Sequence, residues 1–472
     1  MMSKKELCFL PAYKMKEKIV NQELTSLELT ETLVERIEKI NPIINAYCTT
    51  TFDIARDMAR KADDKVKKGE KLGLLNGIPV SIKDLNETAG IRTTFGSNIF
   101  KDNIPEKDEL FVKRLKDAGI VLLGKTNTPE FGHKAVTDNF IFGETKNPWN
   151  LKRTPGGSSG GAAAAVASGL SPLAHGSDGG GSIRIPSSLC GVYGLKPSYG
   201  RVPRLWEKIS FNRLSHNGSI VRYVKDAALM LDVIAGSSTI DKYSLCNPER
   251  SYVEALKEIP KKLRIGYSLD LGYVKAIDPE VKKCVIESMD KFEKIGWSVD
   301  EVKIKLKQAY RSFITIVCAG YAYDYQKYLK DWKDKMTPSF VKMIGVGLTV
   351  NGIDIMHAEM QGLKFYNQFT DYFKNYDILI TPTIAITAFD LGKMYPDQIE
   401  SKTVSPTGWM PFTYPFNMTG HPVATIPCGW SSEGLPIGMQ IVGPPQNDEL
   451  VLKVSKAFEE ISPWQKRIPE LS

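Results

Sequence analysis

Three short segments of this chain combine glycine, serine and one lysine in patterns that suit acyl-transfer chemistry. The first, GIPVSIKD at 77–84, ends an apolar run with Lys83. The second, GGSSGG at 156–161, holds two adjacent serines and leads into an alanine-rich stretch. The third, GSDGGGSIRIP at 176–186, places three glycines directly before Ser182. Serine, lysine and free backbone N–H groups are what a nucleophilic attack on a carbonyl requires.

Consecutive glycines can turn several backbone N–H groups toward one oxygen, and such fixed donors stabilise the negative charge that develops there. One donor of this kind contributes about 2.7–4 kcal/mol in the transition state. A serine hydroxyl becomes a good nucleophile only when a neighbour takes its proton. A lysine titrates at about 10.4, so a lysine base must be neutralised by burial, which we expect from Ile78, Val80 and Ile82.

Each segment alone also has a structural explanation. Lys83 can end its strand by reaching solvent or by pairing with Asp84. GGSSGG can be a turn capped by a serine, and the third segment can be an ordinary glycine-rich loop. Only the three segments together favour a catalytic site.

Three other motif matches are decoys. GIVLLGKT at 119–126 fits a phosphate-binding loop in letters, but its apolar centre predicts a paired strand. GGSSG at 156–160 fits a nucleophile elbow, but the preceding 147–155 carries two prolines and no apolar run. SFVK at 339–342 matches S-x-x-K without its partner motifs.

The three segments, together with GKTNTPEFG at 124–132, FNMTGHPVATIPCGW at 416–430 and GLPIGMQIVGP at 434–444, resemble the amidase signature family. The resemblance is strong over 25–235, good over 370–465 and poor over 240–365. It implies that Ser182 is the acyl nucleophile, Ser158 the bridging serine and Lys83 the base. Ser182 follows Ser158 by 24 residues, as the family pattern requires.

The same resemblance implies the remaining site residues. The oxyanion donors are the N–H groups of Gly179, Gly180, Gly181 and Ser182. Asp178 and Arg184 are expected to pair and to hold the loop. Many relatives carry a larger residue at the position of Gly179. Neither a metal nor an organic cofactor is needed for this chemistry.

A Ser-His-Asp arrangement is the competing mechanism. The chain has five histidines, His133, His175, His216, His357 and His421. His175 lies seven residues before Ser182, in a setting, SPLAHG, that predicts the end of a strand. We interpret it as a structural histidine.

Helical periodicity over 26–40 and about 53–69, and buried-strand patterns over 77–85 and 119–127, predict an α/β architecture. The resemblance implies one domain, 1–472, with a large mixed sheet covered by helices on both faces. Within it we expect four regions: N-terminal helices (1–70), the signature core (71–235), a variable region (236–370) and the C-terminal part of the core (371–472).

Composition narrows the class of protein. With 42% hydrophobic and 25% charged residues, the chain is in the globular range. The net charge of +8 comes from interleaved charges, which predicts a solvated surface and no nucleic-acid partner. No apolar run of about 18 residues and no signal-peptide core occur, so we expect no membrane association. Seven scattered cysteines without a C-x-x-C pair predict reduced thiols, a cytoplasmic location and no metal site.

The predicted function is hydrolysis of small, peptide-like or oligomeric amides. The run AHGSDGGGSIRIPSS at 174–188 is similar to amidases of the 6-aminohexanoate-cyclic-dimer hydrolase type, which implies nylon-like oligoamides as substrates. The aromatic segment 407–420 either lines an apolar acyl pocket or packs in the core. The alternative function is that of the glutaminase component (the A component) of a tRNA-dependent amidotransferase, although 201–222 looks more like a free-standing amidase. The resemblance is compatible with a homodimer.

Overall fold

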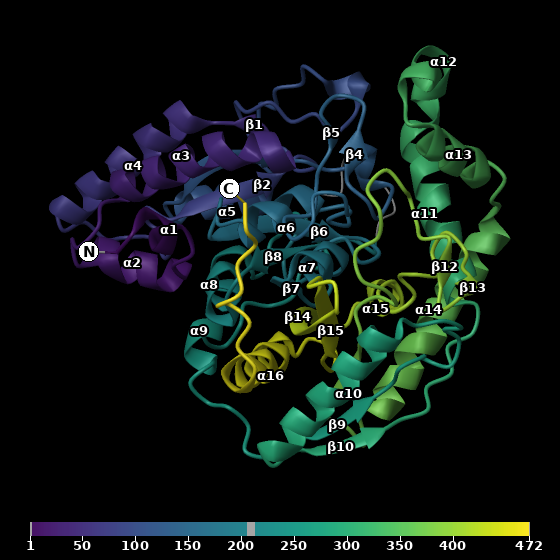
Figure 1. The fold of residues 1–472 in the computed structure, drawn as a ribbon. Helices are drawn as coiled ribbons and strands as arrows, with labels where there is room; N and C mark the ends of the chain where they lie inside the picture. Colours follow the sequence, from purple (N-terminus) through teal and green to yellow (C-terminus); the bar gives the residue numbers. More distant parts are fainter. Residues whose placement is uncertain (1, 205–212, 472) are drawn as a thin grey trace.

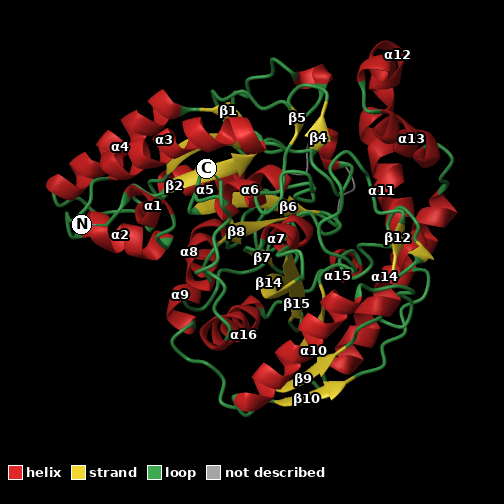
Figure 2. Cartoon of the chain, viewed as in Figure 1, coloured by secondary structure: helices red, strands yellow, loops and turns green. Residues whose placement is uncertain are grey.

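A large mixed sheet forms the centre of the molecule (Figures 1 and 2). The structure is a computed structural model that describes residues 2–204 and 213–471. Within these ranges the sheet has eleven strands. Their order is β1 (Tyr47–Thr50), β3 (Val121–Thr126), β2 (Pro79–Lys83), β6 (Leu173–Asp178), β8 (His216–Val221), β7 (Tyr193–Lys196), β14 (Val423–Trp430), β15 (Pro436–Val442), β11 (Ile378–Pro382), β9 (Arg264–Tyr267) and β10 (Ser298–Glu301). The β3–β2, β2–β6, β11–β9 and β9–β10 pairs are parallel and the other neighbours are antiparallel. Two short hairpins, β4 (Asp138–Asn139) with β5 (Gly143–Glu144) and β12 (Gln398–Ile399) with β13 (Lys402–Thr403), lie outside the sheet.

The helices of the described chain are α1 (Lys4–Cys8), α2 (Ala12–Val20), α3 (Ser26–Ile44), α4 (Phe52–Lys67), α5 (Leu110–Asp117), α6 (Gly160–Ala167), α7 (Arg184–Cys190), α8 (Val224–Ile234), α9 (Tyr252–Ala255), α10 (Pro279–Lys294), α11 (Ala309–Tyr325), α12 (Leu329–Trp332), α13 (Pro338–Gly347), α14 (Gly352–Tyr372), α15 (Pro415–Thr419) and α16 (Asp448–Ile461). Short 3₁₀ turns occur at Asn98–Phe100, Glu130–Gly132, Gln326–Tyr328 and Lys333–Lys335.

Helices cover both faces of the sheet. α8, α10 and α16 pack on one face, and α6 and α7 pack on the other. α11 packs against α13, α14 and α15. In Figure 1, α11, α13 and α14 form an outer wall at the edge of the molecule, and α15 lies inward of them. This arrangement confirms the expected α/β fold, a single domain with a mixed sheet and helices on both sides.

Two elements confirm the local sequence signals. The expected helix over 26–40 is α3, whose first turn is capped because the Glu28 N–H donates to Thr25 Oγ1 at 3.0 Å. The GIVLLGKT segment is strand β3, buried along its whole length and paired with β1 and β2. Its backbone N–H groups are therefore used in the sheet, and it is not a phosphate-binding loop.

Strand β2 positions Lys83 by its two-residue period. Ile78, Val80 and Ile82 belong to the main hydrophobic core. Lys83 shares the opposite face with Ser81, because alternate residues of a strand point the same way. The sequence-based expectation that the three apolar residues enclose the amine is therefore wrong. The burial of Lys83 comes from the side of the sheet that α6 covers.

The aromatic segment 407–420 packs in the core. Trp409, Phe412, Tyr414 and Phe416 are each at most 2% exposed and join one hydrophobic cluster with residues of α11 and α14. Core packing is therefore confirmed for these aromatic residues, and the alternative that the segment lines an acyl pocket stays a prediction.

Close packing of α6 explains its small residues. Every residue of α6 is buried. A Cβ atom on Gly161 would lie 2.4 Å from the N atom of Asn127 and 2.5 Å from the carbonyl O of Ala46. Both neighbours are backbone, so they cannot rotate away. Glycine at this position lets the start of α6 approach the strand ends.

No single helix in residues 2–204 and 213–471 is both long and apolar enough to cross a membrane; α13 and α14 pass such a test only as a pair bent by 100°. All seven cysteines are free.

We expect Gly161→Ala to destabilise the protein by about 1–3 kcal/mol, because the added methyl group overlaps two backbone atoms. Urea unfolding followed by circular dichroism measures this change. Gly345→Ala in α13 is the matched control, since a Cβ atom there meets nothing within 4 Å. The control should be stabilised, by up to about 1 kcal/mol, through helix propensity alone. Equal stability of the Gly161 variant and the wild type would contradict the packing argument.

Candidate active site

The three glycine- and serine-rich segments meet at the end of strand β2. The Nζ atom of Lys83 lies 2.7 Å from Oγ of Ser158 and 3.1 Å from Oγ of Ser177. The N–H of Ser159 donates to the carbonyl of Ser182 at 3.2 Å. Residues separated by about a hundred positions in the chain are thus brought together as one cluster.

Ser158 lies in the tight turn that leads into α6. Gly156 has φ +77°, a left-handed conformation that favours glycine. The peptide bond between Gly157 and Ser158 is cis. A Cβ atom on Gly157 would lie 2.8 Å from backbone atoms of Val136. The two glycines therefore let the turn press against its neighbour and hold Ser158 over Lys83.

Lys83 is fully buried, and its electrostatics follow from that burial. Burial lowers the pKa of Lys83 to about 7, although the negative charge of Asp178 acts in the opposite direction. A substantial fraction of the amine is therefore neutral near neutral pH. A neutral amine has a lone pair that can accept a proton from a hydroxyl 2.7 Å away.

The glycine-rich turn 179–182 connects β6 to α7. Ser182, Gly179 and Gly180 are partly exposed, whereas Lys83 is not. Among the described residues, no acceptor is found for the N–H groups of Gly179, Gly180 and Ser182. All three donors belong to residues that are partly exposed. Such donors suit an oxygen that gains negative charge.

Gly181 differs from the sequence-based expectation. Its N–H donates to Oδ1 of Asp178 at 2.7 Å, so it is not an open oxyanion donor in this structure. The physical reason is that the Asp178 carboxylate folds back over the turn and also accepts from the N–H of Ile183 at 3.2 Å. The N–H of Gly181 therefore shapes the turn.

The two exposed glycines of the turn have different surroundings. A Cβ atom on Gly179 would meet only the Cβ of Ser215, at 4.0 Å. A Cβ atom on Gly180 would lie 2.5 Å from the ring of Phe313 in α11. The turn therefore has room for a side chain at position 179 and none at position 180.

A buried ion pair holds the turn from below. Asp178 and Arg184 are both fully buried, and Nε of Arg184 lies 2.9 Å from Oδ2 of Asp178. Burial alone would raise the pKa of Asp178, but Arg184 and Asn417 hold that pKa below its usual value. Arg184 also donates to the carbonyl of Thr413 at 2.8 Å and to Gln440 Oε1 at 2.7 Å. All N–H groups of the guanidinium have partners, as a buried charge requires.

Four residues of this site carry no sequence-based prediction. Ser177 places a second hydroxyl beside Lys83. The one sequence signal that could have predicted this role is its position directly before Asp178. Thr413, Asn417 and Gln440 bind Arg184 or Asp178 from parts of the chain more than 200 positions away. Such contacts depend on tertiary folding and leave no local pattern.

The histidines do not take part in this cluster. The His175 ring lies in the middle of β6 and stacks on Phe111 of α5 at 4.0 Å, on the core side of the sheet. His133 contacts Glu130 and Ser339, and His216 contacts the carbonyl of Leu214. No hydrogen bond joins a histidine to Ser158 or Ser182 within the part of the chain that the structure describes. The geometry gives no support to a Ser-His pair.

The described residues contain no group of three or more His, Cys, Asp or Glu side chains arranged to hold a metal ion.

Comparisons with known proteins find relatives along nearly the whole chain. A family model described as Amidase matches residues 28–452. The chain is 38% identical to an acylamidase of Rhodococcus erythropolis, over 99% of this chain and 98% of that protein. It is 34% identical to the A component of the glutamyl-tRNA(Gln) amidotransferase of Sulfurihydrogenibium sp. (strain YO3AOP1), over 96% of this chain and 97% of that protein.

Solved structures are similar over nearly the whole chain. A bacterial aryl acylamidase of the amidase signature enzymes superimposes with a TM-score of 0.92, at 31% identity and 97% coverage of both chains. A 6-aminohexanoate cyclic dimer hydrolase in complex with its substrate superimposes with a TM-score of 0.90, at 30% identity, over 98% of this chain and 99% of that one.

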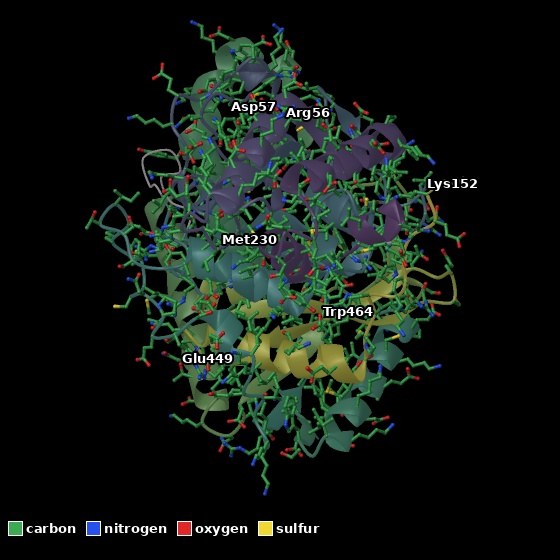
Figure 3. All side chains as sticks on the ribbon, turned by 90° about the vertical axis from the view of Figure 1, so that its left-hand side faces the viewer. Arg56, Asp57, Lys152, Met230, Glu449 and Trp464 are labelled. Carbon is green, nitrogen blue, oxygen red and sulfur yellow. The ribbon has the colours of Figure 1, made fainter. Side chains whose placement is uncertain are left out.

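We expect Arg184→Met to destabilise the fold by about 3–5 kcal/mol, because it leaves the buried Asp178 carboxylate without its charge partner. Chemical unfolding at pH 8 measures the loss. Breaking the exposed Asp57–Arg60 pair by Arg60→Met is the matched control, since its side chains are 68% and 56% exposed. Asp57 lies on the outer surface (Figure 3). The control should change stability by less than about 1 kcal/mol. Similar losses in the two variants would show that Arg184 is not structural in this way.

Proposed function

The chain belongs to the amidase family and is an enzyme that hydrolyses amides, and we propose that it works through an acyl-enzyme formed on Ser182. In this proposal Ser158 is the bridging hydroxyl and Lys83 is the base. The open N–H groups of Gly179, Gly180 and Ser182 are the oxyanion donors. Asp178 and Arg184 act by holding the turn.

Attack on the substrate moves one proton along the cluster. Ser182 Oγ forms a bond to the amide carbonyl carbon, and its proton passes to Ser158 while the Ser158 proton passes to the neutral amine of Lys83. The carbonyl oxygen becomes an oxyanion that accepts hydrogen bonds from the open turn donors. The lysine is then an ammonium ion at 2.7 Å from Ser158.

Cleavage of the C–N bond returns that proton. The tetrahedral intermediate collapses, and the leaving nitrogen takes a proton from the Ser158 hydroxyl. Ser158 then regains a proton from the ammonium group of Lys83. This step matters because an amine leaves poorly unless it is protonated. Water then forms a bond to the acyl carbon and gives a proton to Ser158, whose own proton passes to Lys83. The bond from that carbon to Ser182 Oγ breaks, and the same relay returns the proton to Ser182. The products are a carboxylic acid and an amine.

One observation carries the proposal. The buried amine of Lys83 lies 2.7 Å from the Ser158 hydroxyl, and the N–H of Ser159, the next residue, donates to the carbonyl of Ser182, the candidate nucleophile. Burial keeps the amine basic without keeping it charged. The partial exposure of Ser182 supports its role, since a nucleophile must be reached by substrate.

The substrate class follows from similarity and chemistry together. We propose small or oligomeric amides, with 6-aminohexanoate-type oligoamides as one subclass, because a 6-aminohexanoate cyclic dimer hydrolase superimposes over nearly the whole chain. We propose that residues 1–472 act as one amidase signature domain. A cytoplasmic location is supported by the seven free cysteines. A homodimer fits the family and remains a proposal.

A second candidate function is glutamine hydrolysis as the A component of a tRNA-dependent amidotransferase, which the 34% identity to such a protein favours. The identity to the acylamidase is higher, at 38%. An assay panel of simple amides, glutamine and a linear 6-aminohexanoate dimer separates the two. Turnover of glutamine alone would favour the amidotransferase component.

Ser182→Ala should lower amide turnover by more than about a thousandfold while leaving the unfolding temperature nearly unchanged, because only the nucleophile is lost. Product release from the assay panel measures turnover, and phenylmethylsulfonyl fluoride followed by peptide mass spectrometry locates the reactive serine. Ser159→Ala is the matched control, because among the described residues this neighbouring hydroxyl has one hydrogen bond, which it donates to the carbonyl of Ser177 at 3.3 Å. Retained turnover in the Ser182 variant, or an adduct on another residue, would refute the assignment.

The value of kcat/KM should rise tenfold per pH unit below about 7 and level off above it, because the pKa of Lys83 is lowered to about 7 and only the neutral amine accepts a proton. Initial rates between pH 5 and 9 measure the profile. Lys83→Met should show no such titration and almost no turnover. A flat wild-type profile across pH 6–8 would argue against Lys83 as the base.

A further inference from the structure

Helix α11 contacts segments of the candidate active site at two places. Near its start, the Phe313 ring contacts Gly180 of the open turn. Two turns later, the Tyr321 hydroxyl donates to the carbonyl of Phe131 at 3.4 Å. Phe131 precedes Gly132, where a Cβ atom would lie 3.2 Å from Oγ of Ser158. The helix therefore spans from the oxyanion turn to the loop above Ser158.

One face of α11 has an opening. Phe313, Val317 and Gly320 recur at i, i+4 and i+7, so they share a face of the helix. Among the described residues, no atom lies within 4 Å of a Cβ atom built on Gly320. Val317 and Gly320 are both partly exposed. Space is thus left beside the part of the helix that bonds to the Phe131 loop.

The side chains that pack along α11 in this part of the molecule are largely apolar or aromatic. Phe313 stacks on Tyr414 with ring centroids 5.0 Å apart. Phe131 packs with Tyr325 at 4.2 Å, within an aromatic cluster of α11 and α13. The side chain of Leu85 also reaches Gly132, at 2.8 Å from its Cβ position. Flat aromatic groups bind well among such side chains.

The opening lies on the leaving-group side of the reaction. In the proposed function, Ser158 gives the proton to the departing nitrogen, and the Phe131–Gly132 loop covers Ser158. Gly320 shares a face of α11 with Phe313, which meets Gly180 of the turn, and Tyr321 bonds the same stretch of the helix to that loop. A group attached to the nitrogen would therefore extend toward α11.

We propose that the α11 face of Phe313, Val317 and Gly320 binds the amine portion of the substrate, and that Gly320 lets this subsite accept aryl amines. The inference rests on the proposed function, which fixes the side on which the nitrogen leaves. It adds a residue that determines specificity without taking part in proton transfer. A leucine side chain at position 320 fills the opening and excludes a ring.

The test compares two substrates that share an acetyl group and differ in the leaving group: 4-nitroacetanilide, which releases an aromatic amine, and acetamide, which releases ammonia. Gly320→Leu should lower kcat/KM for 4-nitroacetanilide at least tenfold and change kcat/KM for acetamide less than threefold. Gly345→Leu is the matched control, because it is also a helical glycine with nothing within 4 Å of its Cβ position. It should leave both values within twofold of the wild type.

The outcomes separate the two proposals. An equal loss on both substrates in the Gly320 variant, or no loss on either, would overturn the subsite. Wild-type turnover of acetamide without turnover of 4-nitroacetanilide would also overturn it and would leave the proposed mechanism standing. Turnover of neither substrate, with no phenylmethylsulfonyl fluoride adduct on Ser182, would instead refute the proposed function on which the subsite rests.

Discussion

The contact between the buried Lys83 amine and the Ser158 hydroxyl, at 2.7 Å, is the interaction on which the rest of the site depends. Burial lowers the pKa of this lysine from 10.5 to about 7, a shift that corresponds to roughly 4–5 kcal/mol of stability lost below pH 7. That cost declines as the pH rises toward the pKa of the unfolded chain. The proposed role of Lys83 as a base requires this loss, because a charged lysine cannot accept a proton. The amine is fully buried, and the hydroxyls of Ser158 and Ser177 provide its polar contacts.

The surrounding structure fixes the position of the turn 179–182 relative to the contact between Lys83 and Ser158. The Asp178 carboxylate binds the turn 179–182 through the N–H of Gly181, and Arg184 binds the carboxylate in turn. Arg184 is itself held by Thr413, Asn417 and Gln440 near the C-terminus. One buried charge pair thereby connects the middle of the chain with its last quarter. Glycines complete the arrangement where backbones meet, as at Gly157 and Gly161, since a side chain there would overlap backbone atoms.

The contact between Lys83 and Ser158 restricts which parts of the structure can change. The residues around that contact must keep their positions, whereas residues farther from it can vary. The turn, the lysine and the serines lie at strand ends and helix starts of the central sheet, where the backbone is fixed by paired hydrogen bonds. The proposed amine subsite lies instead on α11, whose main helix contacts are with α13 and α14. A change on the exposed face of such a helix can alter the space beside it without moving Lys83. In this proposal, chemistry and specificity depend on different layers of the fold.

Residue order alone was enough to predict the strand that ends in Lys83, the capped start of α3, the rejection of the phosphate-loop match and the three segments that the fold brings together. These features depend on local periodicity and on residue types at short spacing, which a chain displays directly. The folded molecule was needed to learn which face of β2 carries the amine, that the N–H of Gly181 is already used by Asp178, and that Ser177 adds a second hydroxyl. It was also needed to place Asn417, Gln440 and α11 beside residues more than a hundred positions away. Such contacts arise from the order of strands in the sheet and the packing of whole helices, and neither leaves a trace in neighbouring residues.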